Sequence, residues 1–300
     1  MTATARPAST TPASALRALL ASGRVTHAPG VYDPLTAALA VRAGHRAAHL
    51  SGAAVSAITL GRAEPGFVHG AQIADRASTL APALDGVPLI ADADTGHGNP
   101  LHAVWSAMAY VRAGIAGLHL EDQAGPKRHG HLAGPELIGA TEAAAKITAL
   151  ADQVPEIVVI ARTDAYAVRG LDETIVRCRA YAEAGAEAVL PAGVDTLAEL
   201  TAVHRALPGV PLVVNRSEAG GSRPALTDDE LSEVGVRLVL HPVAALLAAM
   251  RAASLAYRAI ADSGTAEPVD RMPWAAFTTL AGQEEAFGPD ARYVPGTLQT

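Results

Sequence analysis

The 300-residue chain has little cysteine, few aromatic residues and no excess of positive charge. Its single cysteine, Cys178, cannot form a disulfide within the chain, so an oxidising compartment is not indicated. Aromatic residues make up 4% of the sequence and hydrophobic residues 50%, which predicts a core of Ala, Val, Leu and Ile. The formal net charge of -7 argues against a nucleic acid or an anionic membrane as partner and favours small substrates.

Long hydrophobic runs, targeting segments and phosphate-binding loops are also missing. No apolar run approaches the roughly 20 residues that span a bilayer, because Arg, Asp, His or Gly interrupts each one. Residues 1–14 are rich in Ala, Thr, Ser and Pro without the apolar centre of a signal peptide, so we expect a flexible tail on a cytoplasmic protein; an organelle transit peptide is the alternative. The glycines of "GHGNP" do not have the spacing of a nucleotide-binding motif.

Eight short apolar runs alternate with amphipathic segments rich in Ala and Leu. The runs begin near residues 25, 46, 87, 115, 156, 187, 210 and 236. Eight such units in about 240 residues predict an α/β fold, a (β/α)8 TIM barrel over residues 15–263, with an open doubly wound sheet as the alternative. Cys178 is expected in the core. Residues 264–300 carry Trp274, Phe277 and Phe287 at spacings suited to an oligomer contact.

Acidic side chains end the third and fourth runs, and the active site of such a barrel lies at the carboxyl ends of its strands. Asp92 and Asp94 are two residues apart, which on a strand places both carboxylates on one side, and Glu121 ends the next run. Three adjacent carboxylates repel one another unless a proton or a cation is shared, and oxygen ligands suit Mg²⁺ or Mn²⁺ better than Zn²⁺. The alternative is helix capping or structural salt bridges.

Arg162 ends the fifth run and offers a bidentate fork for a substrate carboxylate or phosphonate, or a structural bridge to Asp164 or Glu121. A divalent cation beside an arginine suits cleavage next to a 2-oxo acid, since the metal stabilises the enolate that forms. Such cleavage needs a base and an acid, and the glycine-containing loop after Glu121 is placed to deliver a mobile general acid.

At these positions the chain resembles the isocitrate lyase/phosphoenolpyruvate mutase superfamily, and within it the methylisocitrate lyase-like members. The resemblance covers roughly residues 15–265. It is carried by the ordered segments "GVYDPLTAALAVRAGHRAAHLSG", "ADADTGHGNP", "AGIAGLHLEDQAGPKRHGH", "ARTDAYAVRGLDETIVRCRAYAEAGAEAVLPAG" and "VVNRSEAG". It implies an α/β barrel whose last helix is exchanged between subunits of a dimer of dimers, a tetramer, and a Mg²⁺ site.

The resemblance also implies roles for individual residues. Asp92 would ligate the metal and contact substrate, with Asp94 and Glu121 reaching the metal mainly through water. Ser51 and Gly52 match the start of a loop that holds the 2-oxo acid carboxylate and carbonyl, with Ala53 where relatives have Gly. Gly130, Arg162 and Asn215 match other substrate-binding positions. Tyr32 is expected beside the substrate or in packing. His241, which stands where many methylisocitrate lyases have Tyr, is either a substrate contact or an ordinary turn residue.

Two departures from the family pattern bear on the catalytic residues. Lys127 and His131 match the gating loop of the lyases, but His129 replaces the cysteine that acts as acid, and Ala192 replaces a glutamate after the sixth strand. With Arg162, the residues Lys127, His129 and His131 form the implied catalytic set.

Three interpretations of these departures remain open. In the first, His129 serves as the general acid, since an imidazolium can protonate an enolate. In the second, the chain catalyses the reaction of an oxaloacetate decarboxylase, phosphonopyruvate hydrolase or phosphoenolpyruvate mutase. In the third, it only binds dicarboxylates or another protein. The first choice is a Mg²⁺-dependent carbon–carbon lyase for a methylisocitrate-like or substituted malate-like acid.

Overall fold

Eight parallel strands form the centre of the protein in this computed structural model, which describes residues 11–63, 66–125, 127, 136–218, 226–283 and 286–287. The strands are β1 (Thr26–Pro29), β2 (Ala48–Leu50), β3 (Leu89–Asp92), β4 (Ile115–Glu121), β5 (Val158–Thr163), β6 (Ala188–Pro191), β7 (Leu212–Asn215) and β8 (Val236–His241). Their order is β1-β8-β7-β6-β5-β4-β3-β2, and a parallel bridge between Gly30 and His49 brings the two outer strands together. The predicted (β/α)8 barrel and all eight predicted strands are confirmed.

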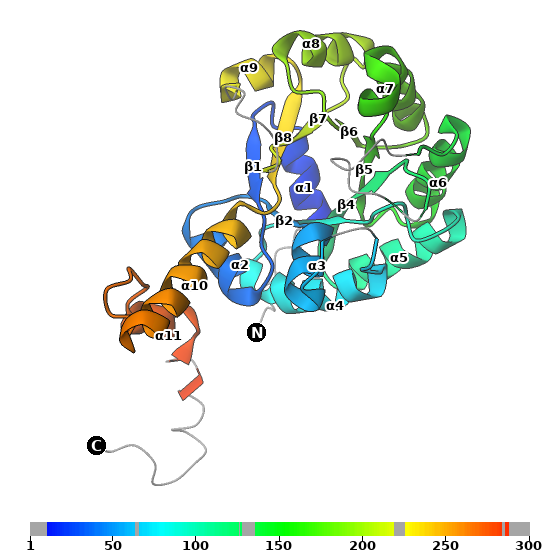
Figure 1. The fold of residues 1–300 in the computed structure, drawn as a ribbon. Coiled ribbons are helices and arrows are strands. Elements are labelled where there is room, and N and C mark those ends of the chain that lie inside the picture. The colour runs from blue at the N-terminus through cyan, green and yellow to red at the C-terminus, as the bar shows by residue number, and fades with distance from the viewer. Residues whose placement is uncertain are drawn as a thin grey trace, which may run out of the picture. The chain divides into compact units, whose positions relative to one another are not determined.

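Helices follow each strand and surround the barrel (Figure 1). They are α2 (Pro34–Arg42), α3 (Gly52–Leu60), α4 (Gly70–Leu80) with the short 3-10 helix η1 (Ala81–Leu84), α5 (Pro100–Arg112), α6 (Ala140–Gln153), α7 (Tyr166–Glu183), α8 (Leu197–Ala206) and α9 (Asp228–Glu233). Cys178 lies in α7, fully buried, as predicted. Burial raises the pKa of its thiol to about 12, so it is an inert core residue.

An additional helix, α1 (Pro12–Leu20), closes the amino-terminal end of the barrel. Thr11 caps it by accepting a hydrogen bond from the Ser14 amide at 3.2 Å. Leu16 is fully buried among interior strand residues, and a Cβ on Gly117 would lie 2.5 Å from Leu16 Cδ2, so glycine is needed there. The helix begins inside the segment expected to be a tail, and its Leu16 fills the interior at the amino-terminal end of the barrel.

Alternation along the strands decides which side chains reach the barrel interior. On β5, Val158 and Ile160 pack in the interior cluster, whereas Val159 and Ala161 pack in the cluster shared with the helices. Arg162 therefore follows on the interior side.

The chain divides into two compact units, residues 1–246 and 247–300. The division falls in the first turn of α10 (Ala244–Ser263), and α11 (Trp274–Leu280) belongs to the second unit. Only Leu246 of α10 is buried. By length and composition α10 would also suffice to cross a membrane, so the expectation that no apolar run approaches that length was too strict: an Ala-rich helix meets the criterion despite Arg251 and Arg258.

Candidate active site

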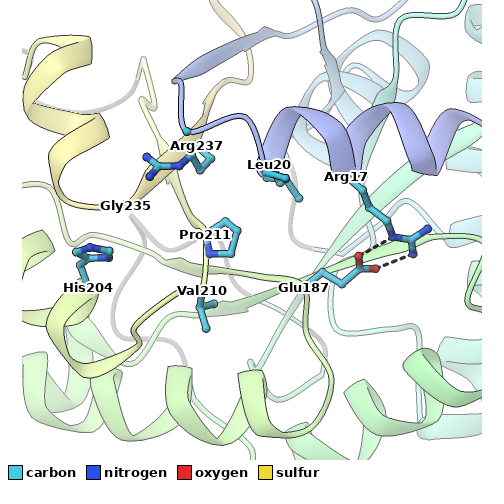
Figure 2. Close-up of a pocket in the computed structure, with 11 residues that line it drawn as sticks. Arg17, Leu20, Glu187, His204, Val210, Pro211, Gly235 and Arg237 are labelled. Carbon is cyan, nitrogen blue, oxygen red and sulfur yellow. Dashed lines mark hydrogen bonds and ion pairs between the residues drawn. The ribbon is translucent and has the colours of Figure 1, made fainter.

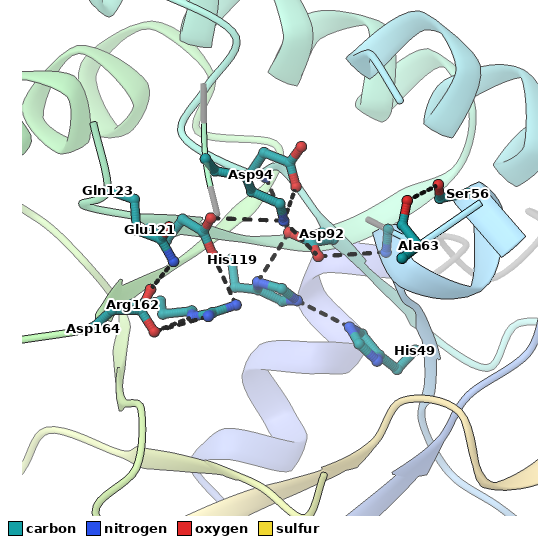
Figure 3. A network of polar contacts seen from close by, with 12 residues as sticks. His49, Ser56, Ala63, Asp92, Asp94, His119, Glu121, Gln123, Arg162 and Asp164 are labelled. Atoms are coloured by element: carbon teal, nitrogen blue, oxygen red, sulfur yellow. Dashed lines mark hydrogen bonds and ion pairs between the residues drawn. The ribbon is translucent and has the colours of Figure 1, made fainter. Parts of the chain in front are cut away.

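Three buried carboxylates converge at the carboxyl-terminal ends of β3 and β4 (Figure 3). Asp92 ends β3, Asp94 follows it, and Glu121 ends β4. The Lys127 ammonium lies among them: it forms an ion pair with Asp94 and lies 3.6 Å from Glu121 Oε1 and 3.8 Å from Asp92 Oδ2. The structure thus brings together all three residues predicted as metal ligands, with a cation between their oxygens.

The sequence analysis placed Asp94 on the same strand as Asp92, whereas in the structure Asp94 lies beyond the end of that strand. β3 ends at Asp92, and Asp94 has a φ of 47°, in the left-handed region that costs energy for a residue with a Cβ. Its amide donates to Asp92 Oδ1 at 3.0 Å, and its carbonyl accepts from the Glu121 amide at 2.9 Å. These hydrogen bonds hold a strained residue beside the strand ends, a common feature of functional sites.

Arg162 joins the cluster from β5. Its guanidinium lies 2.8 Å from both Glu121 Oε2 and Asp164 Oδ1, so the structural bridges weighed from the sequence are both present. Gln123 donates to the other Asp164 oxygen at 3.0 Å and fixes that carboxylate. Neither Glu121 oxygen accepts a well-aligned hydrogen bond from the described residues, although both are buried. A buried carboxylate in that state has unused ligand capacity.

Two histidines that the sequence analysis did not select lie beneath Asp92. His119 Nδ1 is 3.6 Å from Asp92 Oδ1, and His119 Nε2 is 2.9 Å from Nε2 of His49. Burial lowers the pKa of His119 to about 4 and that of His49 to about 3. The available signal was a polar residue within an apolar strand, two residues before Ser51 in "AHLS" and two before Glu121 in "HLE".

The carboxylates have divergent pKa values. Burial, followed by the charge of Asp92, raises the pKa of Asp94 to about 6, and burial raises that of Glu121 to about 7 despite Arg162 and Lys127. Burial also acts to raise the pKa of Asp92, but Lys127, His119 and Arg162 outweigh it and hold that pKa below its ordinary value. Asp92 is therefore the most persistently ionised member.

Asp122, next to Glu121, has a structural role instead. Its carboxylate accepts hydrogen bonds from Thr163 Oγ1 and Tyr181 OH at 2.7 Å, from the Asp164 amide at 3.0 Å and from Arg177 Nη1 at 2.9 Å. These contacts tie β4 and β5 to α7, away from the interior. Adjacent acids at one strand end thus serve opposite faces of the barrel wall.

The residues implied to hold a substrate carboxylate begin α3 beside Asp92. Ser51 is the buried N-cap of α3, and its side chain does not bond to the helix. Gly52 and Ala53 form the first turn, and the Gly52 amide faces Asp92 Oδ2 at 3.4 Å. The amino terminus of a helix favours anionic groups, so this end suits a carboxylate.

Other predicted site residues are less closely connected. The Tyr32 amide donates to Thr36 Oγ1 at 3.1 Å, and burial raises the pKa of its phenol. Asn215 ends β7 with an exposed side chain. His241 lies on the opposite side of β8 from the interior residues Leu238 and Leu240, and its Nε2 is 2.9 Å from Nδ1 of His27. His129, Gly130 and His131 lie outside the described residues.

The position that the family fills with glutamate, Ala192, packs against the interior cluster. At the two ends of the segment that follows Glu121, the Ala124 amide donates to the Glu136 carbonyl at 2.7 Å, and the Ile138 amide donates to the Asp122 carbonyl at 3.0 Å. The flanks of residues 126–135 are therefore held next to each other beside the carboxylates.

The carboxylate oxygens of Asp92, Asp94 and Glu121 are potential ligands of a metal ion. Among the described residues, no three His, Cys, Asp or Glu side chains already stand at the spacing of metal ligands. The carboxylates are instead arranged around the Lys127 ammonium. Because the donors are all oxygens and both Glu121 oxygens lack well-aligned hydrogen bonds from the described residues, these side chains have the chemistry that suits a hard divalent cation.

A separate cavity of about 460 Å³ opens at the amino-terminal end of the barrel (Figure 2). Its lining includes Arg17, Glu187, His204 and Arg237. Arg17 and Glu187 pair with each other at 2.6 Å. The end of a barrel opposite to the strand carboxyl termini is associated with stability, and the perturbed carboxylates are elsewhere, so we place the active site at the Asp92 cluster despite the size of this cavity.

Comparison with known proteins decides the family. The model of the phosphoenolpyruvate phosphomutase family matches residues 16–261. The chain belongs to this family. It is 38% identical to the 2-methylisocitrate lyase of Bacillus subtilis (strain 168) over 253 residues, 84% of this chain and 83% of that one. It is 34% identical to the 2,3-dimethylmalate lyase of Eubacterium barkeri over 95% and 99% of the two chains.

A solved structure of the family agrees. Oxaloacetate acetylhydrolase, in complex with the inhibitor 3,3-difluorooxalacetate, superposes with a TM-score of 0.87 at 32% identity, over 93% of this chain and 96% of that one. The resemblance to the isocitrate lyase/phosphoenolpyruvate mutase superfamily is confirmed, and the protein is an enzyme of the carbon–carbon lyase type found in that superfamily.

Replacing Asp122 tests its structural role. Asp122→Ala should lower the free energy of unfolding by about 3–5 kcal/mol, because it leaves the buried Arg177 without its carboxylate. Glu173→Ala is the matched control, since Glu173 is the more exposed partner of the same arginine and its removal should cost less than about 1 kcal/mol. Urea unfolding measures both, and equal losses would contradict the assignment.

Replacing Glu121 tests the raised pKa. A carboxyl whose pKa rises from 4.5 in the unfolded chain to about 7 in the fold contributes stability at low pH that is lost as the pH rises through this interval. Glu121→Gln removes that loss, so in EDTA the variant should become more stable relative to the wild type between these two pH values. Chemical unfolding across the range measures the difference, with the exposed Glu233→Gln as control. A constant difference would refute the raised pKa.

Proposed function

We propose that the protein is a Mg²⁺-dependent lyase that acts in the cytoplasm and cleaves a 2-hydroxy di- or tricarboxylate. The carbon that carries the hydroxyl becomes the carbonyl of a 2-oxo acid, and the electron pair of the broken bond forms the enolate of the second carboxylic acid, which is then protonated. The observation that carries the proposal is the buried cluster of Asp92, Asp94 and Glu121 with Lys127 and Arg162 at the strand ends. The named activities of the relatives, on 2-methylisocitrate and 2,3-dimethylmalate, support this substrate class.

Charge balance supports a divalent cation. Four carboxyl groups, those of Asp92, Asp94, Glu121 and Asp164, face two cationic side chains, Lys127 and Arg162, which leaves two negative charges when all are ionised. Without a metal, the raised pKa values of Asp94 and Glu121 relieve this excess by proton uptake. One Mg²⁺ or Mn²⁺ would relieve it at neutral pH, with Asp92 as the direct ligand and the other two acting mainly through water.

Substrate binding follows from the groups around the cluster. Arg162 is held by Glu121 and Asp164 and presents a fixed guanidinium to a carboxylate. The start of α3, from Ser51 to Ala53, offers amide groups to the other end of a 2-oxo acid. A bound cation would polarise the hydroxyl and carboxylate oxygens of the substrate and stabilise the negative charge on the hydroxyl oxygen as its carbon becomes the 2-oxo carbonyl. Asn215, Gly130 and Tyr32 remain proposed substrate contacts. His241 lies on the outer side of β8 beside His27, which favours the alternative of an ordinary turn residue.

The proton for the enolate carbon is assigned to His129. The described residues on either side of its segment are held beside the cluster by the hydrogen bonds of Ala124 and Ile138, which supports this assignment. Lys127, at the near end of the segment, already contacts Asp94, and His131 lies two residues beyond His129. An imidazolium can supply the proton that a thiol supplies in the family pattern.

Oxaloacetate cleavage is the second candidate. The structural match to oxaloacetate acetylhydrolase favours it, and that substrate offers the same 2-oxo dicarboxylate chemistry. Phosphonopyruvate or phosphoenolpyruvate chemistry, and binding of dicarboxylates without turnover, are the remaining alternatives.

A substrate panel with Mg²⁺ and with EDTA tests the proposal. The expected result is metal-dependent release of a 2-oxo acid from 2-methylisocitrate or 2,3-dimethylmalate. Asp92→Asn should lower kcat/KM by roughly 10²–10³-fold, because the metal would lose its direct ligand. The exposed Asp85→Asn is the matched control and should retain activity. If only oxaloacetate or phosphonopyruvate were turned over, one of the alternative activities would replace the proposed cleavage of a 2-hydroxy acid. Turnover in the presence of EDTA would contradict the proposed dependence on a divalent metal.

We further propose a homo-oligomer, a tetramer built as a dimer of dimers, in which α10 packs on a second copy. Leu247, Met250, Tyr257 and Ile260 form one stripe on α10 and are 48–73% exposed. Trp274 of α11 is 76% exposed, so the second unit offers further apolar area. A second copy of the chain is the occupant that the resemblance implies.

Analytical ultracentrifugation tests the oligomer. The wild type should sediment as a tetramer, and Met250→Glu together with Tyr257→Glu should shift it to smaller species, because charge would be buried in the contact. Leu101→Glu, at a position 74% exposed on α5, is the control and should leave the mass unchanged. A wild type that sediments as a monomer would contradict the proposal.

A further inference from the structure

His49 and His119 form a buried pair that the proposed reaction does not use directly. His49 lies on β2 and is 2% exposed, and His119 lies on β4 and is 3% exposed. Figure 3 shows the two rings in line between β2 and the Asp92 carboxylate. The Nε2 atoms are 2.9 Å apart, which is hydrogen-bond distance, so one ring donates and the other accepts.

The contact between His119 Nδ1 and Asp92 determines which of the two rings donates the hydrogen bond that joins them. His119 Nδ1 faces Asp92 Oδ1 at 3.6 Å, longer than a hydrogen bond but close enough for a strong electrostatic interaction. A lone pair on Nδ1 would bring two buried hydrogen-bond acceptors, Nδ1 and the Asp92 carboxylate, face to face, which is unfavourable. A proton on Nδ1 is attracted to Asp92, and in a neutral ring it leaves Nε2 as the acceptor.

His49 must then donate from its own Nε2. This arrangement leaves His49 Nδ1 as a buried acceptor without a hydrogen-bond donor among the described residues. In the reverse pair of tautomers His119 would donate to His49, and the lone pair of His119 Nδ1 would face the Asp92 carboxylate. The arrangement with a proton on His119 Nδ1 is therefore favoured.

We propose that His49 is a positioning residue that acts through His119 on Asp92. By donating to His119 Nε2, His49 fixes the tautomer in which Nδ1–H faces the Asp92 carboxylate. That proton and the Asp94 amide, which donates to Oδ1 at 3.0 Å, together hold Oδ1 on the histidine side. Oδ2, 3.8 Å from the Lys127 ammonium, is left facing the proposed cation position. Outer partners of a ligand orient it in this way and tune metal affinity. The effect on metal binding rests on the proposed function, but the tautomer does not.

Two variants separate the hydrogen bond from the volume of the ring. His49→Phe keeps a ring of similar size and removes the donor. His49→Gln keeps an amide N–H that can reach the position of Nε2. Thermal unfolding of each variant, compared with the wild type, shows whether the barrel is intact.

The first readout is the ¹⁵N spectrum of the imidazoles in metal-free protein. In the wild type His119 should appear as the Nδ1–H tautomer and His49 as the Nε2–H tautomer. His49→Gln should preserve the His119 signal, and His49→Phe should shift it towards a mixture. Because this measurement uses neither metal nor substrate, it tests the pair even if His49→Phe does not fold. A wild-type His119 protonated at Nε2, or at both nitrogens, would overturn the inference.

The second readout is the affinity for Mn²⁺, measured by the loss of the free-ion electron paramagnetic resonance signal. His49→Phe should weaken binding about 10-fold or more, and His49→Gln should restore most of the affinity. Equal affinity of folded His49→Phe and wild type would overturn the positioning role alone. If the wild type binds no Mn²⁺, the proposed function fails, while the ¹⁵N result still decides the tautomer.

Discussion

An excess of negative charge, buried at the carboxyl ends of β3, β4 and β5, is the constraint on which the site depends. Asp92, Asp94 and Glu121 are stable there only because Lys127 and Arg162 lie against them and because protons compensate the rest. Left-handed backbone at Asp94 is held by hydrogen bonds to its neighbours. A barrel that only had to be stable would not need this arrangement.

The barrel makes the arrangement possible by separating its two ends and its two faces. α1 fills the barrel interior at the amino-terminal end with Leu16, whereas the buried carboxylates lie at the other end. Alternation along β4 and the start of the following loop places Glu121 inside and Asp122 outside, where Asp122 ties the wall to α7. Relatives with the same family fold are lyases named for different acids, 2-methylisocitrate and 2,3-dimethylmalate.

Periodic apolar runs were sufficient to predict the barrel, because eight strand-and-helix units leave few other topologies. Strand-end position was sufficient to find Asp92, Glu121 and Arg162, and the structure brings them together with Asp94. The sequence did not reveal that Lys127 lies between the carboxylates, because a loop residue has no periodicity to place it. It also did not reveal the His49–His119 pair, since strand register joins residues 70 positions apart. His241 also ends a strand, but a position at a strand end does not show whether the side chain points into the barrel. In the structure His241 lies on the opposite side of β8 from the interior residue Leu240.

The most direct test of this account is the anomalous scattering of Mn²⁺ in crystals of the protein grown with Mn²⁺ and oxalate, a planar mimic of a 2-oxo acid enolate. The account predicts one peak between Asp92, Asp94 and Glu121, with the Lys127 ammonium displaced from its position among these carboxylates and oxalate on Arg162 and the start of α3. A site without a peak, with Lys127 still paired to Asp94 in the presence of saturating Mn²⁺, would contradict it.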